Sequence, residues 1–274
     1  MPELPEVETV RTALEPGLIG KTILSAEIKN AKVIARPTAD EFRARIVGQR
    51  VTSLTRRGKF LIVNFESSDR LVIHLRMTGQ FVVVPPDYEA EKHTHLIMPT
   101  DDGNEIRYID VRRFGRLWLL KADETDTFTG MEKLGLEPLD EKLTGDYLCE
   151  KYGKRKKPVK EMLLDQSVVA GVGNIYADEI LFDSAILPEK SCDSLSVTDW
   201  NRLANSIHKI ISWGIEINRM TPAEYFVSRG KNYRNIPDLK AYGREKQPCR
   251  ICGETIVKVV IGGRSSCYCP KCQG

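Results

Sequence analysis

Apolar residues recur at two different spacings along the chain, and each spacing predicts its own kind of element. The first apolar residues recur at helical spacing, which predicts a helix that begins at Pro5 and ends before Gly20. Thr38 and Glu41 fit a capping box, which predicts a second, short helix that runs through Ile46. The chain therefore opens with helical segments.

From Val51 onward the pattern changes to short strand-like runs separated by turn residues. The predicted strands are 51–55, 60–65, 71–75, 80–84, 95–98, 106–109 and 117–120. Strands of this kind flanked by helices predict a β-sandwich and an α+β fold class.

The second half has a helical pattern, and residues 134–139 form the linker that precedes it. Within it, the basic run 154–157 is followed by an apolar stretch over 159–164. Gly171 and Gly173 then form a tight turn just ahead of a predicted helix. Such a turn leaves backbone N–H groups that could hold a phosphate, although packing between two helices explains the same pattern.

The composition is that of a globular protein, with 41% hydrophobic and 29% charged residues among 274. No apolar run approaches the ~20 residues that span a bilayer, and the acidic start lacks the basic and apolar regions of a signal peptide. We expect a cytoplasmic protein that does not associate with membranes.

The net charge of +3 is unevenly distributed along the chain. Residues 229–274 contain ten Lys or Arg against three Asp or Glu, a charge of +7, so residues 1–228 carry −4. A basic end on a nearly neutral body predicts contact with a polyanion.

Five of the seven cysteines lie in the last 26 residues. Two CxxC pairs, separated by sixteen residues, match the ligand spacing of a tetrahedral zinc site, and a predicted strand (255–260) and a Gly-Gly turn lie between them. We therefore predict a β-hairpin zinc finger that holds one structural Zn²⁺ through Cys249, Cys252, Cys269 and Cys272. Arg264 beside the turn and Lys258 on the strand could probe a groove. Cys267 is left over, and zinc alone does not distinguish DNA from RNA or protein partners.

Pro2 would carry a free secondary amine once Met1 is removed. An α-amino group has a pKa of roughly 8, so part of it is neutral and nucleophilic at pH 7, and it could form an imine with an aldehyde carbon. Taken alone, Pro2 fits better as the start of a coil that leads into a helix at Pro5.

Several segments together resemble the formamidopyrimidine-DNA glycosylase family of bacterial oxidised-base repair enzymes, which is related to endonuclease VIII. They are MPELPEVET at 1–9, RRGKFL at 56–61, HLRMTG at 74–79, DVRRFG at 110–115, AGVGNIYADE at 170–179, YGR at 242–244 and the zinc hairpin. The resemblance covers essentially the whole chain.

The resemblance implies a bilobal protein with double-stranded DNA in the cleft between the lobes. The implied domains are a catalytic β-sandwich over 1–133, a linker over 134–139, a helix–two-turn–helix DNA-binding domain over 140–240 and the zinc finger over 241–274. Such a protein would act near the nucleoid as a monomer, without a redox or nucleotide cofactor.

The resemblance also assigns roles to residues. Pro2 would be the nucleophile, Glu3 and Lys59 would transfer protons, and Glu6 would support the site. The residues implied to fill the space left by the flipped base are Met77, Arg112 and Phe114. The implied DNA contacts are His93, Arg113, Lys160, Asn174 and Lys258. Arg264 is implied to be a catalytic residue that holds phosphates. Pattern alone would instead place Met77 and Phe114 in a hydrophobic core.

The implied activity is that of a bifunctional glycosylase and abasic-site lyase that excises 8-oxoguanine and formamidopyrimidines through β,δ-elimination. One stretch departs from the family: Asn218 and Arg219 replace a paired glycine, and Pro222 removes a backbone donor in a loop (217–237) that contacts the flipped base. Two alternatives therefore stay open: a relative with a shifted lesion preference, and a non-catalytic protein that senses damaged DNA.

Overall fold

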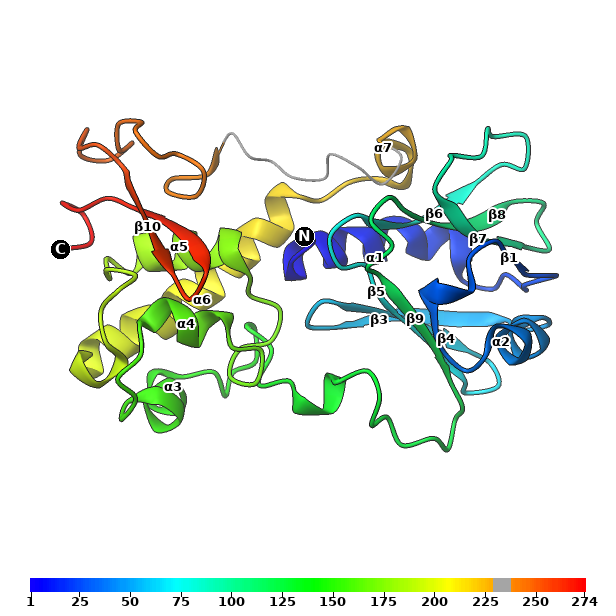
Figure 1. Ribbon diagram of the computed structural model, residues 1–274, viewed down its shortest axis with the longest axis horizontal. Helices are drawn as coiled ribbons and strands as arrows, with labels where there is room; N and C mark the ends of the chain where they lie inside the picture. Colours follow the sequence, from blue (N-terminus) through cyan, green and yellow to red (C-terminus); the bar gives the residue numbers. More distant parts are fainter. Residues whose placement is uncertain (229–237) are drawn as a thin grey trace. The chain divides into compact units, whose positions relative to one another are not determined.

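The computed structural model describes residues 1–228 and 238–274 and divides into two compact units. Unit 1 contains Met1–Pro2, Glu6–Glu132 and the segment that starts at Asn218, whereas unit 2 contains Glu3–Pro5, Lys133–Ile217 and the C-terminal segment. Figure 1 labels the helices and most of the strands of both units.

Unit 1 is built on two β-sheets. In the described residues one sheet has the strand order β1-β7-β8-β6 and the other β2-β9-β5-β4-β3; the pairs are antiparallel except for β2 with β9. The strands are β1 (Glu27–Ile28), β2 (Ile34–Arg36), β3 (Val51–Arg57), β4 (Phe60–Phe65), β5 (Arg70–His74), β6 (Gly79–Val84), β7 (Thr94–Pro99), β8 (Glu105–Asp110) and β9 (Arg116–Leu120).

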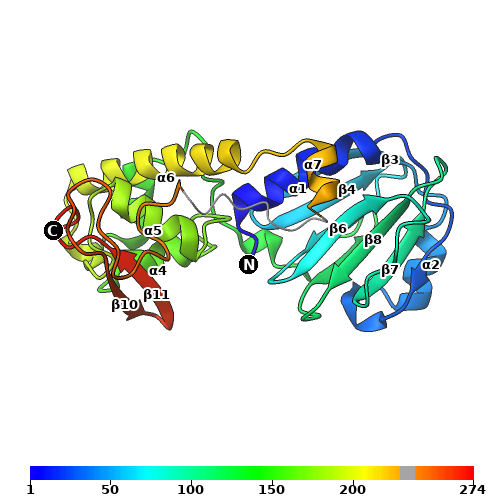
Figure 2. The same cartoon turned by 90° about the horizontal axis from the view of Figure 1, so that it is seen from above.

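The helices of unit 1 pack against these sheets. They are α1 (Leu4–Leu18), α2 (Ala39–Ile46) and α7 (Pro222–Val227), with 3-10 turns η1 (Ala31–Val33) and η2 (Met131–Lys133) in the connections. One hydrophobic core joins side chains of both sheets to buried residues of α1 and α2, such as Val10, Leu14 and Phe42. Figure 2 shows α1 and α7 beside this β-sandwich.

Unit 2 is helical and carries one β-hairpin. Its helices are α3 (Gly145–Tyr152), α4 (Val159–Leu164), α5 (Asn174–Asp183) and the long α6 (Val197–Ile217), with the 3-10 turn η3 (Cys192–Ser194). Leu203, Ile207 and Ile211 of α6 are fully buried in its core. The hairpin pairs β10 (Val257–Ile261) with β11 (Arg264–Tyr268) in antiparallel register.

The sequence prediction of an α+β fold with a β-sandwich is confirmed. The Thr38 hydroxyl accepts a hydrogen bond from the Glu41 N–H at 3.3 Å, as expected for the start of α2. The short strands β1 and β2 were not predicted, because two or three residues show no periodicity. Across the described ranges 1–228 and 238–274, no helix is both long and apolar enough to cross a bilayer.

Candidate active site and nucleic-acid interface

The Glu3 carboxylate lies at the N-terminus of α5, within unit 2. It accepts hydrogen bonds from the N–H groups of Gly173 at 2.9 Å, Ile175 at 2.9 Å and Tyr176 at 3.3 Å. The first N–H groups of a helix have no intrahelical acceptor, and the helix dipole favours an anion there. Glu3 is only 3% exposed, so this end of α5 fixes the orientation of a buried carboxylate.

The two glycines of the turn make room for this arrangement. A Cβ on Gly173 would lie 2.3 Å from Cδ of Glu3, and one on Gly171, which has φ +87°, would lie 2.6 Å from Cβ of Leu4. The Leu4 N–H also donates to the Gly171 carbonyl at 3.0 Å. The N–H groups of Gly173, Ile175 and Tyr176 therefore donate to Glu3, and a phosphate contact of this turn stays a prediction.

A buried ion pair joins α4, α5 and the hairpin in unit 2. Lys160 Nζ lies 2.5 Å from the Asp178 carboxylate and donates to the Ser265 carbonyl at 2.7 Å. The same carboxylate accepts from the Cys267 N–H at 3.0 Å. Burial raises the pKa of Asp178 to about 6 and lowers the pKa of Lys160, while their mutual attraction opposes both shifts. Together these contacts fasten strand β11 to the helices.

Two residues predicted to contact phosphates lie in this network. Lys160 is fully buried, and its ammonium faces Asp178 and the hairpin backbone. Asn174, at the start of α5, donates from Nδ2 to the Ser265 carbonyl at 2.9 Å, and its Oδ1 is buried without a described partner. Their contacts with DNA stay predictions. In the structure, both side chains donate to the Ser265 carbonyl and so hold the backbone next to Arg264.

Arg264 is exposed at the first position of β11, directly after a Gly-Gly turn. Gly262 and Gly263 have φ values of +54° and +73°, a backbone conformation that favours glycine. Lys258 on β10 forms an ion pair with Glu245 on the surface. The hairpin therefore presents Arg264 at its tip, as expected from the sequence.

The four predicted zinc ligands lie together at the base of the hairpin. Their sulfur atoms are all within 4.8 Å of one another, with Cys249 to Cys272 at 3.9 Å and Cys252 to Cys269 at 3.4 Å. A tetrahedral Zn²⁺ with bonds of about 2.3 Å requires sulfur atoms about 3.8 Å apart, so the thiolates fit zinc. The fifth cysteine, Cys267, is buried beside Asp178 and is not part of this cluster.

Lys59 lies in the tight turn between β3 and β4 of unit 1, where Arg57 pairs with Phe60. Gly58 has φ +54°, and Lys59 is 7% exposed. Its positive charge is one of three causes that lower the pKa of the nearby His74 to about 3. Burial of His74 is the largest cause, followed by the charges of Arg76 and Lys59. His74 is therefore neutral near pH 7, and its Nδ1 accepts from the Arg76 N–H at 3.0 Å. We did not assign His74 from sequence, although it lies in the HLRMTG segment.

Met77, Arg112 and Phe114 come together on the surface of unit 1. Arg112 Nη1 lies 2.9 Å from the Met77 sulfur, and the Arg112 guanidinium is 4.7 Å from the centre of the Phe114 ring. The Met77 and Phe114 side chains are 44% and 48% exposed, so the core position that pattern alone favours is wrong for both. Two exposed apolar side chains held by one arginine form a wedge, and we call these three residues the wedge.

The remaining predicted residues lie at separate places in unit 1. Pro2 and Glu6 are buried at the start of the chain. The His93 carbonyl accepts from the Asp110 N–H at 3.0 Å, and Arg113, which has φ +57°, is exposed next to the wedge.

Three known domain families match the chain in succession. They are the formamidopyrimidine-DNA glycosylase N-terminal domain over residues 1–117, its H2TH domain over 134–224, and the zinc finger found in FPG and IleRS over 246–274. The chain belongs to the formamidopyrimidine-DNA glycosylase family. The helix–two-turn–helix and zinc-finger parts of the predicted fold are thereby confirmed.

Full-length relatives support this membership. The formamidopyrimidine-DNA glycosylase of Geobacillus kaustophilus is 42% identical over 274 residues, and that of Pelotomaculum thermopropionicum is 40% identical over 275; each alignment covers the whole chain and 99–100% of the relative. The Lactococcus lactis enzyme has been solved with abasic-site DNA (TM-score 0.89, 33% identity) and with FAPY-dG DNA (TM-score 0.90, 34% identity), each match covering 99% of both chains.

The structure describes the stretch that departs from the family up to Ser228. Pro222 is the first residue of α7, where a helix needs no N–H donor, and Thr221 and Glu224 form a capping box. The missing N–H of Pro222 therefore leaves no hydrogen bond of helix α7 unmade. The rest of the predicted 217–237 loop, residues 229–237, lies outside the described residues.

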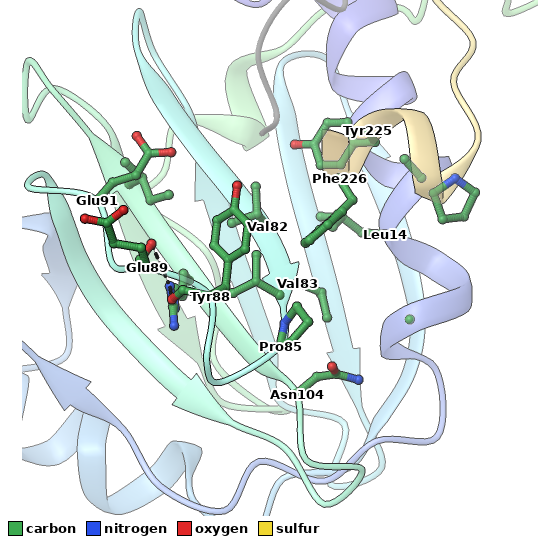
Figure 3. A pocket seen from close by; sticks show the side chains of 16 residues that line it. Leu14, Val82, Val83, Pro85, Tyr88, Glu89, Glu91, Asn104, Tyr225 and Phe226 are labelled. Atoms are coloured by element: carbon green, nitrogen blue, oxygen red, sulfur yellow. Dashed lines mark hydrogen bonds between the residues drawn. The ribbon is translucent and has the colours of Figure 1, made fainter. Parts of the chain in front are cut away.

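Helix α7 is fastened to the β-sandwich. The Tyr225 hydroxyl donates to the Phe81 carbonyl at 3.0 Å, and Phe226 lies 5.3 Å from Tyr88, ring centre to ring centre. Phe226 and Tyr88 are among the residues that line an apolar pocket of about 310 Å³. Figure 3 shows them together with Leu14 and Val83, which also line it. α7 is thus packed on unit 1 as part of its surface.

Proposed function

We propose that this chain is a bifunctional DNA glycosylase and abasic-site lyase that excises oxidised purines, 8-oxoguanine and formamidopyrimidines, from double-stranded DNA. Its family membership and its likeness to Lactococcus lactis structures with abasic-site and FAPY-dG DNA support a role in base excision repair. The lyase step, the nucleophile and the residue roles are proposed from the resemblance of this chain's motifs to the family, together with the chemistry of the residues.

The observation that carries the proposal is the placement of Glu3. A buried carboxylate that accepts from the N–H groups of Gly173, Ile175 and Tyr176 is fixed in direction, and it directly follows Pro2 in the chain. A proton-transfer group acts only within hydrogen-bond reach of its target, so a fixed carboxylate beside the nucleophile suits this chemistry.

The reaction requires that Met1 is removed, because a retained methionine makes the Pro2 nitrogen an amide. The free amine then attacks C1′ of the damaged nucleotide, the C1′–N bond to the base breaks, and the base leaves with a proton. Opening of the sugar breaks C1′–O4′, O4′ takes a proton with the help of Glu3, and the amine nitrogen becomes an iminium.

Elimination then cleaves the strand on both sides of the sugar. Loss of a C2′ proton breaks the bond from C3′ to its phosphate oxygen, and a second elimination breaks the bond from C5′ to its phosphate oxygen. Water hydrolyses the iminium and returns the Pro2 amine. Lys59 is the proposed partner of Glu3 in proton transfer, and Arg264 holds the phosphates while the second bond breaks. Glu6 supports the site around the nucleophile.

We assign the wedge a role in moving the damaged base out of the duplex. A base within a duplex cannot be attacked at C1′, and flipping it out costs about a few kcal/mol. Apolar side chains that enter a base step stabilise the distorted duplex. Met77 and Phe114 are the exposed apolar pair for this role, and Arg112 can hydrogen-bond the partner base that loses its pair.

Contact with the DNA backbone is proposed for a set of basic side chains and one amide side chain. Arg264 at the hairpin tip and the exposed Arg113 are the side chains best placed to meet phosphates, and His93, Lys160, Asn174 and Lys258 complete the set. When bound, Zn²⁺ supplies folding free energy to the hairpin through its four thiolates. One chain carries every proposed group, so we propose that the protein acts as a monomer.

A relative with a shifted lesion preference is the second candidate, and α7 favours it. Asn218 and Arg219 replace a glycine pair that is usual in the family, and Tyr225 fastens the following helix to Phe81. A stretch held in this way offers less freedom to close over a base than one that begins with two glycines.

A cleavage panel distinguishes these candidates. The substrates carry 8-oxoguanine opposite each base, formamidopyrimidine, thymine glycol, dihydrouracil or an abasic site, and Pro2→Gly is the inactive control. We expect the fastest cleavage at 8-oxoguanine opposite cytosine. If that duplex is cut no faster than undamaged DNA while another lesion is cut, the shifted preference is correct. If damaged DNA is bound and none is cut, the protein is a damage sensor.

A further inference from the structure

Asp110 lies at the point where the two loops of the wedge meet. The first loop, 75–78, connects β5 to β6 and carries Met77; the second, 111–115, connects β8 to β9 and carries Arg112 and Phe114. Asp110 is the last residue of β8 and is 0% exposed. No role has so far been assigned to this carboxylate.

Both oxygens of the Asp110 carboxylate accept hydrogen bonds from these loops or from the strand beside them. Oδ1 accepts from the Thr78 hydroxyl at 2.5 Å and from the Arg112 N–H at 3.2 Å. Oδ2 accepts from the Gly115 N–H at 2.8 Å and from the Tyr108 hydroxyl at 3.1 Å. Four donors on two oxygens suit an ionised carboxylate, which only accepts.

The backbone of Asp110 is also held in place. Its carbonyl accepts from His95 Nε2 at 2.8 Å and from the Arg113 N–H at 3.3 Å, and its own N–H donates to the His93 carbonyl. The Arg112 N–H additionally lies 3.0 Å from the Thr78 hydroxyl oxygen, so the two loops are also bonded to each other. Asp110 is therefore a fixed point to which both loops are attached.

Glycines at the loop ends are required for this arrangement. A Cβ on Gly115 would lie 1.8 Å from the Tyr108 hydroxyl oxygen, and one on Gly79 would lie 2.8 Å from it. The Tyr108 hydroxyl thus fits between the ends of the two loops and still reaches Asp110. Burial, and then the Asp110 charge, raise the pKa of Tyr108, so its hydroxyl remains a donor.

We propose that Asp110 is a positioning residue that holds both loops in one geometry, so that Met77, Arg112 and Phe114 enter DNA as a preformed wedge. This inference rests on the wedge role in the proposed function. Arg76, which precedes Met77, and Arg113, which lies between Arg112 and Phe114, have φ of +54° and +57°, strained conformations that the surrounding bonds must maintain. Without the Asp110 carboxylate the two loops lose their shared hydrogen-bond acceptor. The loops must then become ordered before the wedge can insert into DNA.

The test compares two activities that differ in their need for a wedge. The first is affinity for a duplex that carries a tetrahydrofuran abasic analogue opposite 2-aminopurine, whose fluorescence reports insertion without any chemistry. The second is borohydride trapping on a single-stranded abasic oligonucleotide, which has no partner base. For Asp110→Asn, we expect the duplex affinity and fluorescence response to fall about ten- to a hundredfold, since buried donors lose their acceptor, with trapping unchanged.

Matched variants separate positioning from general stability. Glu105→Gln removes the ion pair with Arg107 at the other end of β8 and should leave duplex affinity unchanged. Thr78→Val removes one loop's hydroxyl in nearly the same volume and should reproduce a smaller part of the loss, which keeps the test decisive if Asp110→Asn folds poorly. In a Met77→Ala, Arg112→Ala, Phe114→Ala background, Asp110→Asn should have no further effect on duplex affinity.

Three results would overturn the role of Asp110. They are unchanged duplex affinity in Asp110→Asn and Thr78→Val, a parallel fall in duplex affinity and single-strand trapping, and a full Asp110→Asn effect that persists in the triple-alanine background. A wild-type protein that forms no trapped adduct contradicts the proposed lyase instead, and the duplex measurement still decides the role of Asp110.

Discussion

Gly173→Ala is the substitution that most directly tests how Glu3 is held. Gly173 has an extended backbone with φ −128°, which alanine adopts without strain. Its added methyl would lie 2.3 Å from Cδ and 2.5 Å from Oε1 of Glu3. The methyl group therefore acts through the Glu3 carboxylate and not through the backbone conformation.

The size of the effect follows from these distances. Carbon atoms prefer about 3.5–4.0 Å, so the carboxylate must move by roughly 1 Å or more. Its hydrogen bonds, now 2.9–3.3 Å long, would then be lost or badly lengthened. We expect a loss of about 1–3 kcal/mol in the free energy of unfolding and about a hundredfold loss in excision rate, the usual cost of a 1 Å displacement of a catalytic group.

Single-turnover excision, measured where urea titration shows the variant to be fully folded, checks this expectation. Gly17→Ala is the matched control, because its added Cβ would meet only Val83 Cγ1 at 3.9 Å. A Gly173→Ala protein that excises as fast as the wild type would refute the assigned role of the α5 N-terminus. So would a loss that Gly17→Ala reproduces.

Three further predictions concern pH, the buried ion pair and zinc. Because the pKa of His74 falls from 6.5 to about 3 on folding, the stability it contributes is complete above pH 6.5 and is lost as the pH falls towards 3. The expected loss in the free energy of unfolding is about 2 kcal/mol at pH 5. Urea titrations of the wild type and of His74→Phe at several pH values measure it, and an equal pH dependence of stability in the two proteins would contradict it. Lys160→Met leaves the Asp178 carboxylate buried without its cation and should cost about 3–5 kcal/mol; a urea titration that finds less than about 1 kcal/mol excludes this. Chelation of zinc should unfold the hairpin and abolish DNA binding, and a gel-shift assay that finds full binding after complete removal speaks against it.

Local patterns in the sequence predicted most of the fold. The helical spacing gave α1, the capping residue Thr38 gave the start of α2, and the CxxC spacing predicted the four sulfur atoms that lie together. Each of these depends on neighbours in the chain. The strands β1 and β2 did not follow from pattern, since their pairing with β7 and β9 is set by tertiary contacts.

The site was less predictable from local pattern. Exposure of Met77 and Phe114 depends on the two loops that Asp110 joins, and apolar residues in a sequence normally signal a core. The glycine turn before α5 indicated an anion site, yet its anion is the side chain of Glu3, about 170 residues earlier in the chain. No local pattern relates such distant residues, so only the resemblance to a family pointed to their roles.

The role of Pro2 as the nucleophile is tested most directly by locating the covalent bond between the protein and DNA. The protein is incubated with an abasic-site duplex and borohydride, digested, and the cross-linked peptide is sequenced by mass spectrometry. We expect an N-terminal peptide that lacks Met1, with reduced sugar on the Pro2 nitrogen, and no adduct after Pro2→Gly. An adduct on Lys59 or another lysine, or an undiminished adduct in Pro2→Gly, would contradict it.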